Sequence, residues 1–423
     1  MKILRPLSDV EAAFHYMREL GNGSTQVVTA ARVNGDFDST TLSSRLNTWA
    51  VRHEVLNVTV HKSCANTGQE ILEFVHRPCD PGQMTLSHEP KWIDHQKIFN
   101  QQINTPLQDN WPWRLSLILA PGALYLYFTR SHVISDAYST RLLLQSLLEI
   151  LVWNVCTGRA STLLPSRCEQ PVQSTSTTPA TTASEKLAPS LRHCMASTID
   201  QRRTRIHRRT LDRALSASII TVCKMRGITL NECFAAALAE AYASCLGTQQ
   251  VELYTAINSR RHFSAALASG LGCNIHVLNC PMLATPLPLD SQALRYRSAL
   301  SKASTGWAPS QLNHATIRSK VEDLCTAETF LGPCITNSGV NDFTSAIYQR
   351  VDLVETAVNR NVANYSVVLH LSCFRGLLQL LYSYANPAMS DALVKEIDYA
   401  LMTKLGLLET SLPGHPPLMR VAQ

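Results

Sequence analysis

A strand pattern, a polar turn and a helix pattern follow one another over residues 123–152, and this succession constrains the chain more than any other feature. The segment 123–129 is short, aromatic and rich in strand formers, whereas the segment 140–152 repeats apolar side chains at helical spacing. The sequence between them, Arg-Ser-His-Val-Ile-Ser-Asp-Ala-Tyr-Ser, is mostly polar. It places His132 where a strand ends.

His132 and Asp136 are the reactive side chains of this turn. Loops at strand ends are where a rigid scaffold presents reactive groups, and histidine can accept and return a proton near neutral pH. Asp136 could orient the imidazole or serve another role. The same spacing also occurs by chance, so it does not establish catalysis alone. A metal site is less favoured, because no His or Cys cluster nearby supplies a third and fourth ligand.

Composition describes an ordinary globular protein. The chain has 423 residues, of which 45% are apolar and 17% charged, which argues against a fibrous or disordered chain. The net charge of +6 is mild. The most basic run, 202–209, lacks interleaved aromatic residues, so we interpret it as a solvated segment and expect no nucleic-acid partner. The alternative for this run is contact with a phosphate-bearing coenzyme or an acidic carrier protein.

Cysteine usage and hydropathy predict location. The 13 cysteines include no Cys-x-x-Cys pair, and the first residues lack the apolar core of a secretory signal, so we expect reduced thiols and a cytoplasmic protein. No run of about 18 uninterrupted apolar residues occurs, which predicts no membrane span. No heptad pattern or large apolar stripe stands out, and we expect a monomer.

Local signals divide the chain into elements. Ser8 and Glu11 have the form of a capping box and Gly21 of a helix end, which predicts a helix over 9–20. His53, on the apolar face of a helix predicted over 39–55, is interpreted as a buried, hydrogen-bonded histidine rather than a catalyst. The remaining predictions for this half are strands at 27–33, 57–61, 70–75 and 113–119 and a helix at 94–102.

The segment 166–190 is dominated by Ser, Thr, Pro, Gln and Ala, and it is predicted to be a polar linker. It would separate an N-terminal lobe, 1–165, from a C-terminal lobe, 191–423.

The second half repeats the alternation of helices and strands. A capping box at 229–232 begins a helix that ends at Gly247, and a strand at 251–257 leads to Asn258, Ser259, Arg260 and Arg261. Other predicted elements are helices at 211–224 and 390–405, the latter ended by Gly406, and strands at 366–372 and 377–385.

Two short segments of this half bear on a site. The turn 270–274 is too short and irregular to bind a dinucleotide, so no nicotinamide cofactor is implied. At an apparent strand end, Thr336, Asn337 and Ser338 present small polar groups that can donate hydrogen bonds to an oxyanion, although most such triplets are turns. An arginine after the strand 251–257 could pair with a carboxylate of the first lobe, and Asp136 is the one we favour.

The order of these motifs resembles the chloramphenicol acetyltransferase-like superfamily. This superfamily includes peptide synthetase condensation domains, polyketide-associated acyltransferases and BAHD acyltransferases. The resemblance rests on the capped first helix, Arg-His-Glu-x-Leu at 52–56, His-x-x-x-Asp at 132–136, Asn-x-Arg at 258–260 and Asn-x-Gly at 337–339. It extends over roughly residues 5–405.

The resemblance implies an α/β fold of two similar lobes, each a mixed sheet covered by helices, with a tunnel between them. His132 matches the family's general base. Asp136 matches an aspartate that turns away from the tunnel and pairs with an arginine, here Arg260 with Arg261 in reserve. Asn337 and Ser338 match tunnel-lining positions, and Thr336 or Ser338 would stabilise the oxyanion.

Two positions depart from the family pattern. Ser131 stands where condensation domains carry a second histidine, which favours an ester-forming enzyme, because acyltransferases of the superfamily commonly lack that histidine. Ala137 stands where the family has glycine and adds a methyl group at the tunnel. The Asp-Phe-Gly-Trp-Gly signature of BAHD enzymes is absent.

We therefore predict an O-acyltransferase that moves an acyl group from a thioester to a hydroxyl of a small secondary metabolite. The co-substrate would be acyl-coenzyme A or an acyl carrier protein, with no bound cofactor, metal or covalent intermediate. The alternatives are a standalone amide-forming condensation enzyme, a cyclase of the same fold that needs no thioester, and a non-catalytic descendant that binds a partner in the cleft.

Overall fold

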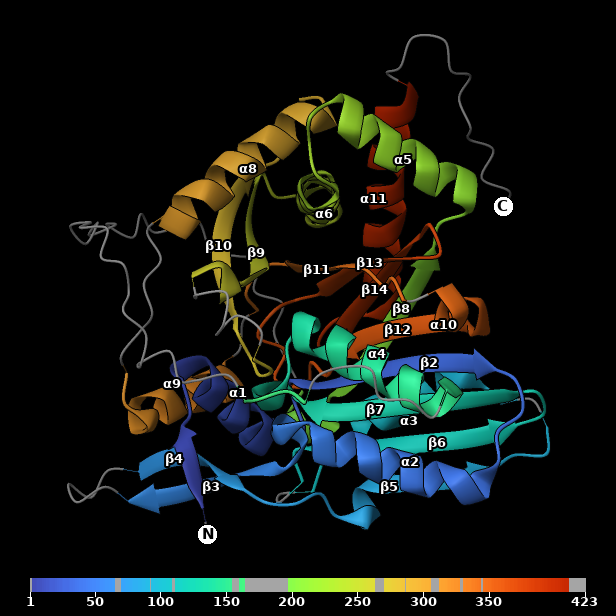
Figure 1. Ribbon diagram of the computed structural model, residues 1–423. Coiled ribbons are helices and arrows are strands. Elements are labelled where there is room, and N and C mark those ends of the chain that lie inside the picture. Colours follow the sequence, from blue (N-terminus) through green and yellow to red (C-terminus); the bar gives the residue numbers. More distant parts are fainter. Residues whose placement is uncertain are drawn as a thin grey trace.

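The computed structural model describes residues 2–64, 70–91, 93–108, 111–153, 160–163, 197–262, 270–285, 287–305, 312–327, 330–343 and 345–410. These residues form two lobes, each built on a sheet (Figure 1). The predicted linker, 166–190, lies outside the described residues.

The first lobe is centred on a sheet whose strand order is β12-β2-β7-β6-β5. Its strands are β2 (Gln26–Asn34), β5 (Met84–His88), β6 (Trp113–Ala120), β7 (Ala123–Ser131) and β12 (Val351–Val358). Neighbouring strands are antiparallel except β5 and β6, which are parallel, so the sheet is mixed.

Helices cover both faces of this sheet because its strands alternate two sets of apolar side chains. One set packs with α2 (Ser39–Arg52) and α4 (Ala137–Trp153) around Trp49, Trp113 and Phe128. The other set packs with α3 (His95–Asn104). A small sheet of order β1-β4-β3, made of β1 (Ile3–Pro6), β3 (Val58–Cys64) and β4 (Glu70–His76), adjoins α1 (Asp9–Leu20) and α9 (His314–Thr326).

The second lobe has a sheet of order β10-β9-β11-β13-β14-β8. Its strands are β8 (Arg203–Thr210), β9 (Gln250–Asn258), β10 (Ile275–Leu283), β11 (Cys334–Val340), β13 (Val368–Phe374) and β14 (Leu377–Asn386). The strand β11 runs parallel to β9 and β13, and the other pairs are antiparallel. The helices packed with this sheet are α5 (Arg213–Met225), α6 (Leu230–Leu246), α8 (Leu289–Thr305) and α11 (Asp391–Thr410).

The strand β12 links the lobes, since it lies between β11 and β13 in sequence but pairs with β2 of the first sheet from Val351 to Val358. In Figure 1 this orange strand runs between the blue β2 of the first sheet and the strands β14 and β8 of the second. The shorter helical elements are η1 (Glu54–Leu56), η2 (Pro81–Gln83), η3 (His132–Ile134), η5 (Ile199–Gln201), η6 (Ser259–His262) and α10 (Ser345–Arg350).

The α/β fold of two lobes with mixed, helix-covered sheets, predicted from the resemblance, is confirmed. Both capping boxes form, and Gly247 ends α6 in the left-handed conformation with φ 65°. Two local predictions are wrong. The basic run 202–209, interpreted as a solvated segment, forms most of the edge strand β8, in which Arg208 and Arg209 pair with carboxylates. Gly406 does not end the last helix, because α11 continues to Thr410.

Candidate functional site

A cavity of about 320 Å³ lies where the two lobes meet. The first lobe contributes α1, the turn after β7 and the start of α4, and the second half of the chain contributes β9, β10, β11, β13 and the loop that follows β12. The size is at the lower end of the range that small-molecule sites occupy.

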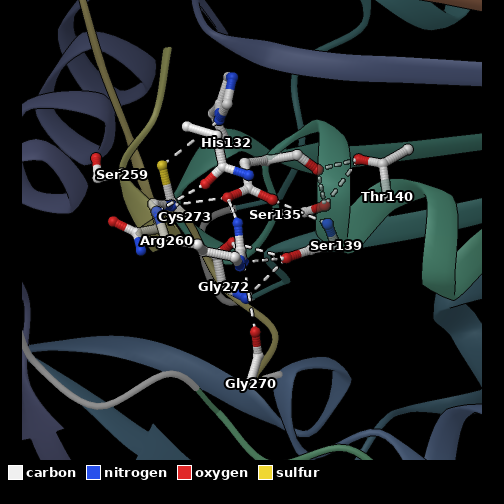
Figure 2. Close-up of polar contacts among 12 residues, drawn as sticks. His132, Ser135, Ser139, Thr140, Ser259, Arg260, Gly270, Gly272 and Cys273 are labelled. Atoms are coloured by element: carbon white, nitrogen blue, oxygen red, sulfur yellow. Dashed lines mark hydrogen bonds and ion pairs between the residues drawn. The ribbon is translucent and has the colours of Figure 1, made fainter. Parts of the chain in front are cut away.

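His132 enters this cavity from the first lobe. It follows β7, whose nine residues are all buried, and the Ser131 hydroxyl accepts a hydrogen bond from the backbone N–H of Val133 at 3.3 Å, which starts the short helix η3. The imidazole stacks on Phe14 of α1 with ring centroids 4.5 Å apart and planes 14° apart. The Sγ atom of Cys273 lies 3.7 Å from Nδ1 (Figure 2), which leaves Nε2 as the nitrogen available to a ligand.

The imidazole of His132 is neutral at neutral pH. Burial lowers its pKa from 6.5 to about 4, the cations Arg130 and Arg360 act in the same direction, and Asp136 acts against them. A neutral imidazole has a free lone pair, which is the form a general base requires.

Asp136 is fixed by three donors and makes no hydrogen bond to His132 within the described part of the chain. Its Oδ1 accepts from the backbone N–H of Ser139 at 2.9 Å, and its Oδ2 accepts from the backbone N–H of Asn274 at 3.0 Å. Arg260 completes the set through an ion pair in which both side chains are buried. This is the pair that the resemblance implies; the side chain of Arg261, its reserve, lies outside the described residues.

Arg260 also contacts Ser139 of α4 and the turn 270–274. Its Nη2 donates to the Ser139 hydroxyl at 2.9 Å, and Ser139 in turn donates to the carbonyl of Gly272 at 2.9 Å (Figure 2). The backbone N–H of Asp136 donates to the same carbonyl at 3.2 Å. The sequence predicts only that the turn 270–274 is irregular. In the structure this turn connects the second lobe to the segment of the first lobe that contains Asp136 and Ser139.

Thr336, Asn337 and Ser338 lie on β11 and line the cavity, although the sequence places them at a strand end. The Ser338 hydroxyl donates to the carbonyl of Leu371 at 3.3 Å, and Asn337 Oδ1 accepts from the backbone N–H of Gly339 at 2.8 Å. The Thr336 hydroxyl and the Asn337 amide nitrogen make no hydrogen bond within the described residues, so both can donate to a ligand.

Four polar residues of the cavity were not anticipated from the sequence. Arg130, Arg360, Tyr365 and His370 all line it, and Arg130 and Arg360 are almost fully buried. His370 donates to or accepts from the Ser383 hydroxyl at 2.8 Å, and burial lowers its pKa to about 3, so it is neutral as well. The sequence offers little indication that Arg360 lines a cavity, because Asn359-Arg360-Asn361 has the composition of a polar loop.

The two departures from the family pattern differ in their surroundings. Ser131 is buried and caps η3, whereas Ala137, the first residue of α4, is exposed and lines the cavity. The methyl group of Ala137 therefore occupies space in the site.

The chain has the chloramphenicol acetyltransferase-like fold that condensation domains share with acetyltransferases. The condensation domain of the monacolin K polyketide synthase MokA is similar to it with a TM-score of 0.70 and 13% identity, over 97% of this chain and 99% of that one. The first condensation domain of the calcium-dependent antibiotic synthetase, solved with a substrate analogue, gives 0.68 and 13%, over 96% and 97%.

An O-acetyltransferase has the same fold. The TRI3 trichothecene 15-O-acetyltransferase of Fusarium sporotrichioides aligns with a TM-score of 0.66 and 13% identity, over 96% of this chain and 95% of that one. Neither a protein-family model nor a curated protein matches the sequence.

Among the described residues, no group of three or more His, Cys, Asp or Glu side chains is arranged to hold a metal ion. Likewise, no helix in the described part of the chain has the length and apolar character needed to cross a bilayer.

Proposed function

We propose that this chain is an acyltransferase that moves an acyl group from a thioester to a hydroxyl of a small secondary metabolite, with His132 as general base. The observation that carries the proposal is the position of a neutral, half-buried imidazole at the junction of the two lobes, with its Nδ1 engaged by Cys273. Solved structures of the same fold include condensation domains and an O-acetyltransferase, which supports group transfer of this kind.

In the proposed reaction, Nε2 of His132 takes the hydroxyl proton as the acceptor oxygen attacks the thioester carbonyl carbon. The tetrahedral intermediate then collapses, the carbon–sulfur bond breaks, and the imidazolium returns its proton to the leaving thiolate. General-base catalysis of this kind contributes on the order of a hundred- to ten-thousandfold in rate. No metal ion and no acyl-enzyme are needed.

The proposed oxyanion donors are the Thr336 hydroxyl and the Asn337 amide nitrogen, since the Ser338 hydroxyl already donates to Leu371. Removing one such donor typically costs about a hundred- to thousandfold in kcat. Asp136 and Arg260 act as positioning residues, because they fix the turn without touching the imidazole.

The acyl donor is either a coenzyme A thioester or an acyl group on a carrier protein. The test is mass spectrometry of the protein incubated with acyl-coenzyme A thioesters and a mixture of alcohols and amines, with an acyl carrier protein as the second donor. Thioester-dependent acylation of a hydroxyl supports the proposal. Exclusive acylation of amines favours the amide-forming alternative, which the similarity to condensation domains supports.

The matched variants are His132→Gln and His53→Gln. His53 is also buried, with its ring nitrogens 2.8 Å from the Ser161 hydroxyl and 2.9 Å from the Ser146 hydroxyl, but it lies outside the cavity. We expect His132→Gln to abolish transfer and His53→Gln to retain it. Equal activity of the two variants would exclude His132 as the base, and a function untouched by His132→Gln would favour the non-catalytic alternative.

A further inference from the structure

We propose that one of the two reactants carries a carboxylate and that Arg360 binds it in the cavity. The inference deepens the proposed function, because it names a chemical class for the substrate of the same site. It rests on that function only for the assignment of the carboxylate to the acyl donor or to the acceptor.

Arg360 is a buried cation without a protein counterion among the described residues. Its side chain is 5% exposed, its Nη2 donates to the side-chain oxygen of Asn364, and its guanidinium lies 5.2 Å from the ring of Tyr365. Its Nε is buried and makes no hydrogen bond within the described part of the chain. A buried charge is costly unless it is paired, so a group from outside the protein is expected to supply the missing anion.

The charges around Arg360 reinforce this expectation. Among the described residues, the cavity lining includes Arg130 and Arg141 besides Arg360, and its one carboxylate, Asp136, is committed to Arg260. Arg130 is 1% exposed and donates to the hydroxyls of Thr29 and Thr140, and no carboxylate of the described residues pairs with it.

The other titratable groups of the lining do not offset this charge. Both histidines are neutral, because burial lowers the pKa of His132 to about 4 and that of His370 to about 3. Burial also raises the pKa of the Cys334 thiol to about 12, so it is not an anion. Arg360 is therefore surrounded by neutral groups and a positive excess.

A carboxylate is the anion that this arrangement favours. A guanidinium is planar and pairs with carboxylates through parallel hydrogen bonds, whereas phosphate sites usually gather several cations or a helix N-terminus around one anion. Both terminal nitrogens of Arg130 already donate to protein oxygens, so Arg360 is the deeply buried guanidinium left to bind a ligand in a cavity of about 320 Å³, which matches the smaller group.

The position of Arg360 links binding to catalysis. Arg360 follows β12 by two residues and lies close enough to His132 to lower its pKa. A carboxylate on Arg360 would offset that charge and make His132 a stronger base. The pKa of His132 is therefore expected to be higher with a substrate that has the carboxylate. With such a substrate, the fall of kcat on the acidic side should begin at a higher pH than with a substrate that lacks it.

The binding test uses benzoate and its neutral isostere benzamide, titrated against the full chain by calorimetry. We expect the wild-type protein to bind benzoate on the order of tenfold more tightly or better, as one charge-assisted pair provides. Arg360→Gln should remove this preference. Arg209→Gln should keep it, because Arg209 pairs with Asp398 outside the cavity lining.

A wild-type protein that binds benzoate no better than benzamide, or an unchanged preference in Arg360→Gln, would overturn the inference. Arg360→Lys provides a second variant if the glutamine variant does not fold. It retains the charge but not the planar fork, so we expect a reduced preference, and an undiminished one would count against recognition by Arg360.

Turnover then assigns the carboxylate. Succinyl- and butyryl-coenzyme A, each with a neutral alcohol, test the donor, while 3-hydroxybutyrate and its methyl ester, each with acetyl-coenzyme A, test the acceptor. A preference for benzoate without transfer from any thioester would leave the carboxylate site standing and contradict the proposed function. Transfer without a preference for benzoate would contradict the carboxylate site alone.

Discussion

At the scale of single residues, Asp136 holds the turn that carries His132 and makes no hydrogen bond to the imidazole within the described part of the chain. Its carboxylate accepts from the backbone of Ser139 and Asn274 and pairs with Arg260, so one side chain joins the start of α4 to the second lobe. An aspartate four residues after a histidine is easily interpreted as its catalytic partner. Here its contacts connect two segments that lie far apart in the sequence.

Asp136→Asn is expected to destabilise the protein strongly. The change leaves Arg260 buried without its counterion, which typically costs about 3–5 kcal/mol of unfolding free energy. Denaturant unfolding measures this cost, and the double variant with Arg260→Gln should recover part of it, because both charges are then gone. A single variant as stable as the wild type, and merely slow, would show that the pair does not hold the lobes together.

Four histidines with lowered pKa values predict how the free energy of unfolding depends on pH. Burial lowers the pKa of His15 and His370 to about 3 and that of His53 and His132 to about 4, from 6.5. Below pH 6.5 the unfolded chain therefore binds protons that the native protein does not. Stability is complete above pH 6.5 and is lost as the pH falls towards 4.

The expected slope is up to about 1.4 kcal/mol per pH unit for each histidine involved. Urea unfolding at intervals between pH 7.5 and pH 4.5 measures it, and His53→Gln should make the slope shallower by one histidine. A free energy of unfolding that is constant between pH 7 and pH 5 would contradict the prediction. For the same reason, the kcat/KM of the free enzyme should show no loss centred on pH 6.5.

The sequence identified the site residues that stand in a short motif or directly beside a recognisable strand. It missed those that only the folded structure brings to the site. His132 and Asp136 stand in one short motif, and Arg260 directly follows a recognisable strand, so an ordered set of motifs predicted them together. Phe14, Arg360 and Cys273 carry no such motif. Phe14 and Cys273 contact the imidazole, and Arg360 lowers its pKa, only because α1, the loop after β12 and the turn 270–274 meet in space.

At the scale of elements, two capping boxes begin helices with different relations to the site. Ser8 and Glu11 exchange hydrogen bonds at the start of α1, which carries Phe14 against His132. Thr229 and Glu232 do the same at the start of α6, a helix that contributes no residue to the cavity lining. The two capping boxes offer a matched test of whether α1 positions the imidazole of His132.

Ser8→Ala and Thr229→Ala should each cost about 1 kcal/mol of unfolding free energy, because each loses the side-chain half of its box. Only Ser8→Ala should also lower kcat/KM, severalfold, since a loosened α1 weakens the stack of Phe14 on His132. Thermal unfolding and steady-state kinetics measure the two effects. Equal kinetics in both variants would mean that α1 has no positioning role.

Elements were predicted well where helix caps and the spacing of apolar residues define them. They were predicted poorly where contacts with residues distant in the sequence define them. The helices α1, α5 and α6 follow from local signals within a few residues. The strand β8 did not, because its arginines look solvated until Asp398 of α11 and Glu355 of β12 are placed beside them. Gly406 was misread because packing of α11 on the second lobe outweighs the weak local tendency of glycine to end a helix.

At the scale of the whole molecule, the chain does not divide into two independent halves. The strand β12 leaves the second sheet to pair with β2, so the first sheet includes a strand from near the end of the chain. Glu355 of β12 also accepts from Arg208 of β8 at 3.0 Å, and Asn104 of α3 exchanges hydrogen bonds with the backbone of Thr204. Unfolding either lobe therefore removes contacts from the other.

This continuity predicts that the two lobes unfold together. Trp49 and Trp113 are fully buried in the first lobe, so tryptophan fluorescence reports mainly on it, whereas far-ultraviolet circular dichroism reports on both. Leu401→Ala, in the core of the second lobe, should cost about 2–5 kcal/mol and shift both transitions equally.

Leu294→Ala serves as the control, because Leu294 is 48% exposed on α8 of the same lobe and its truncation should change stability by about 0.5 kcal/mol or less. If Leu401→Ala shifts the dichroism transition and leaves the fluorescence transition in place, the lobes unfold separately. In that case β12 would bind the first sheet too weakly to couple them. A common shift instead means that a substitution far from the cavity affects the first lobe through β12, the strand that leads into the loop with Arg360.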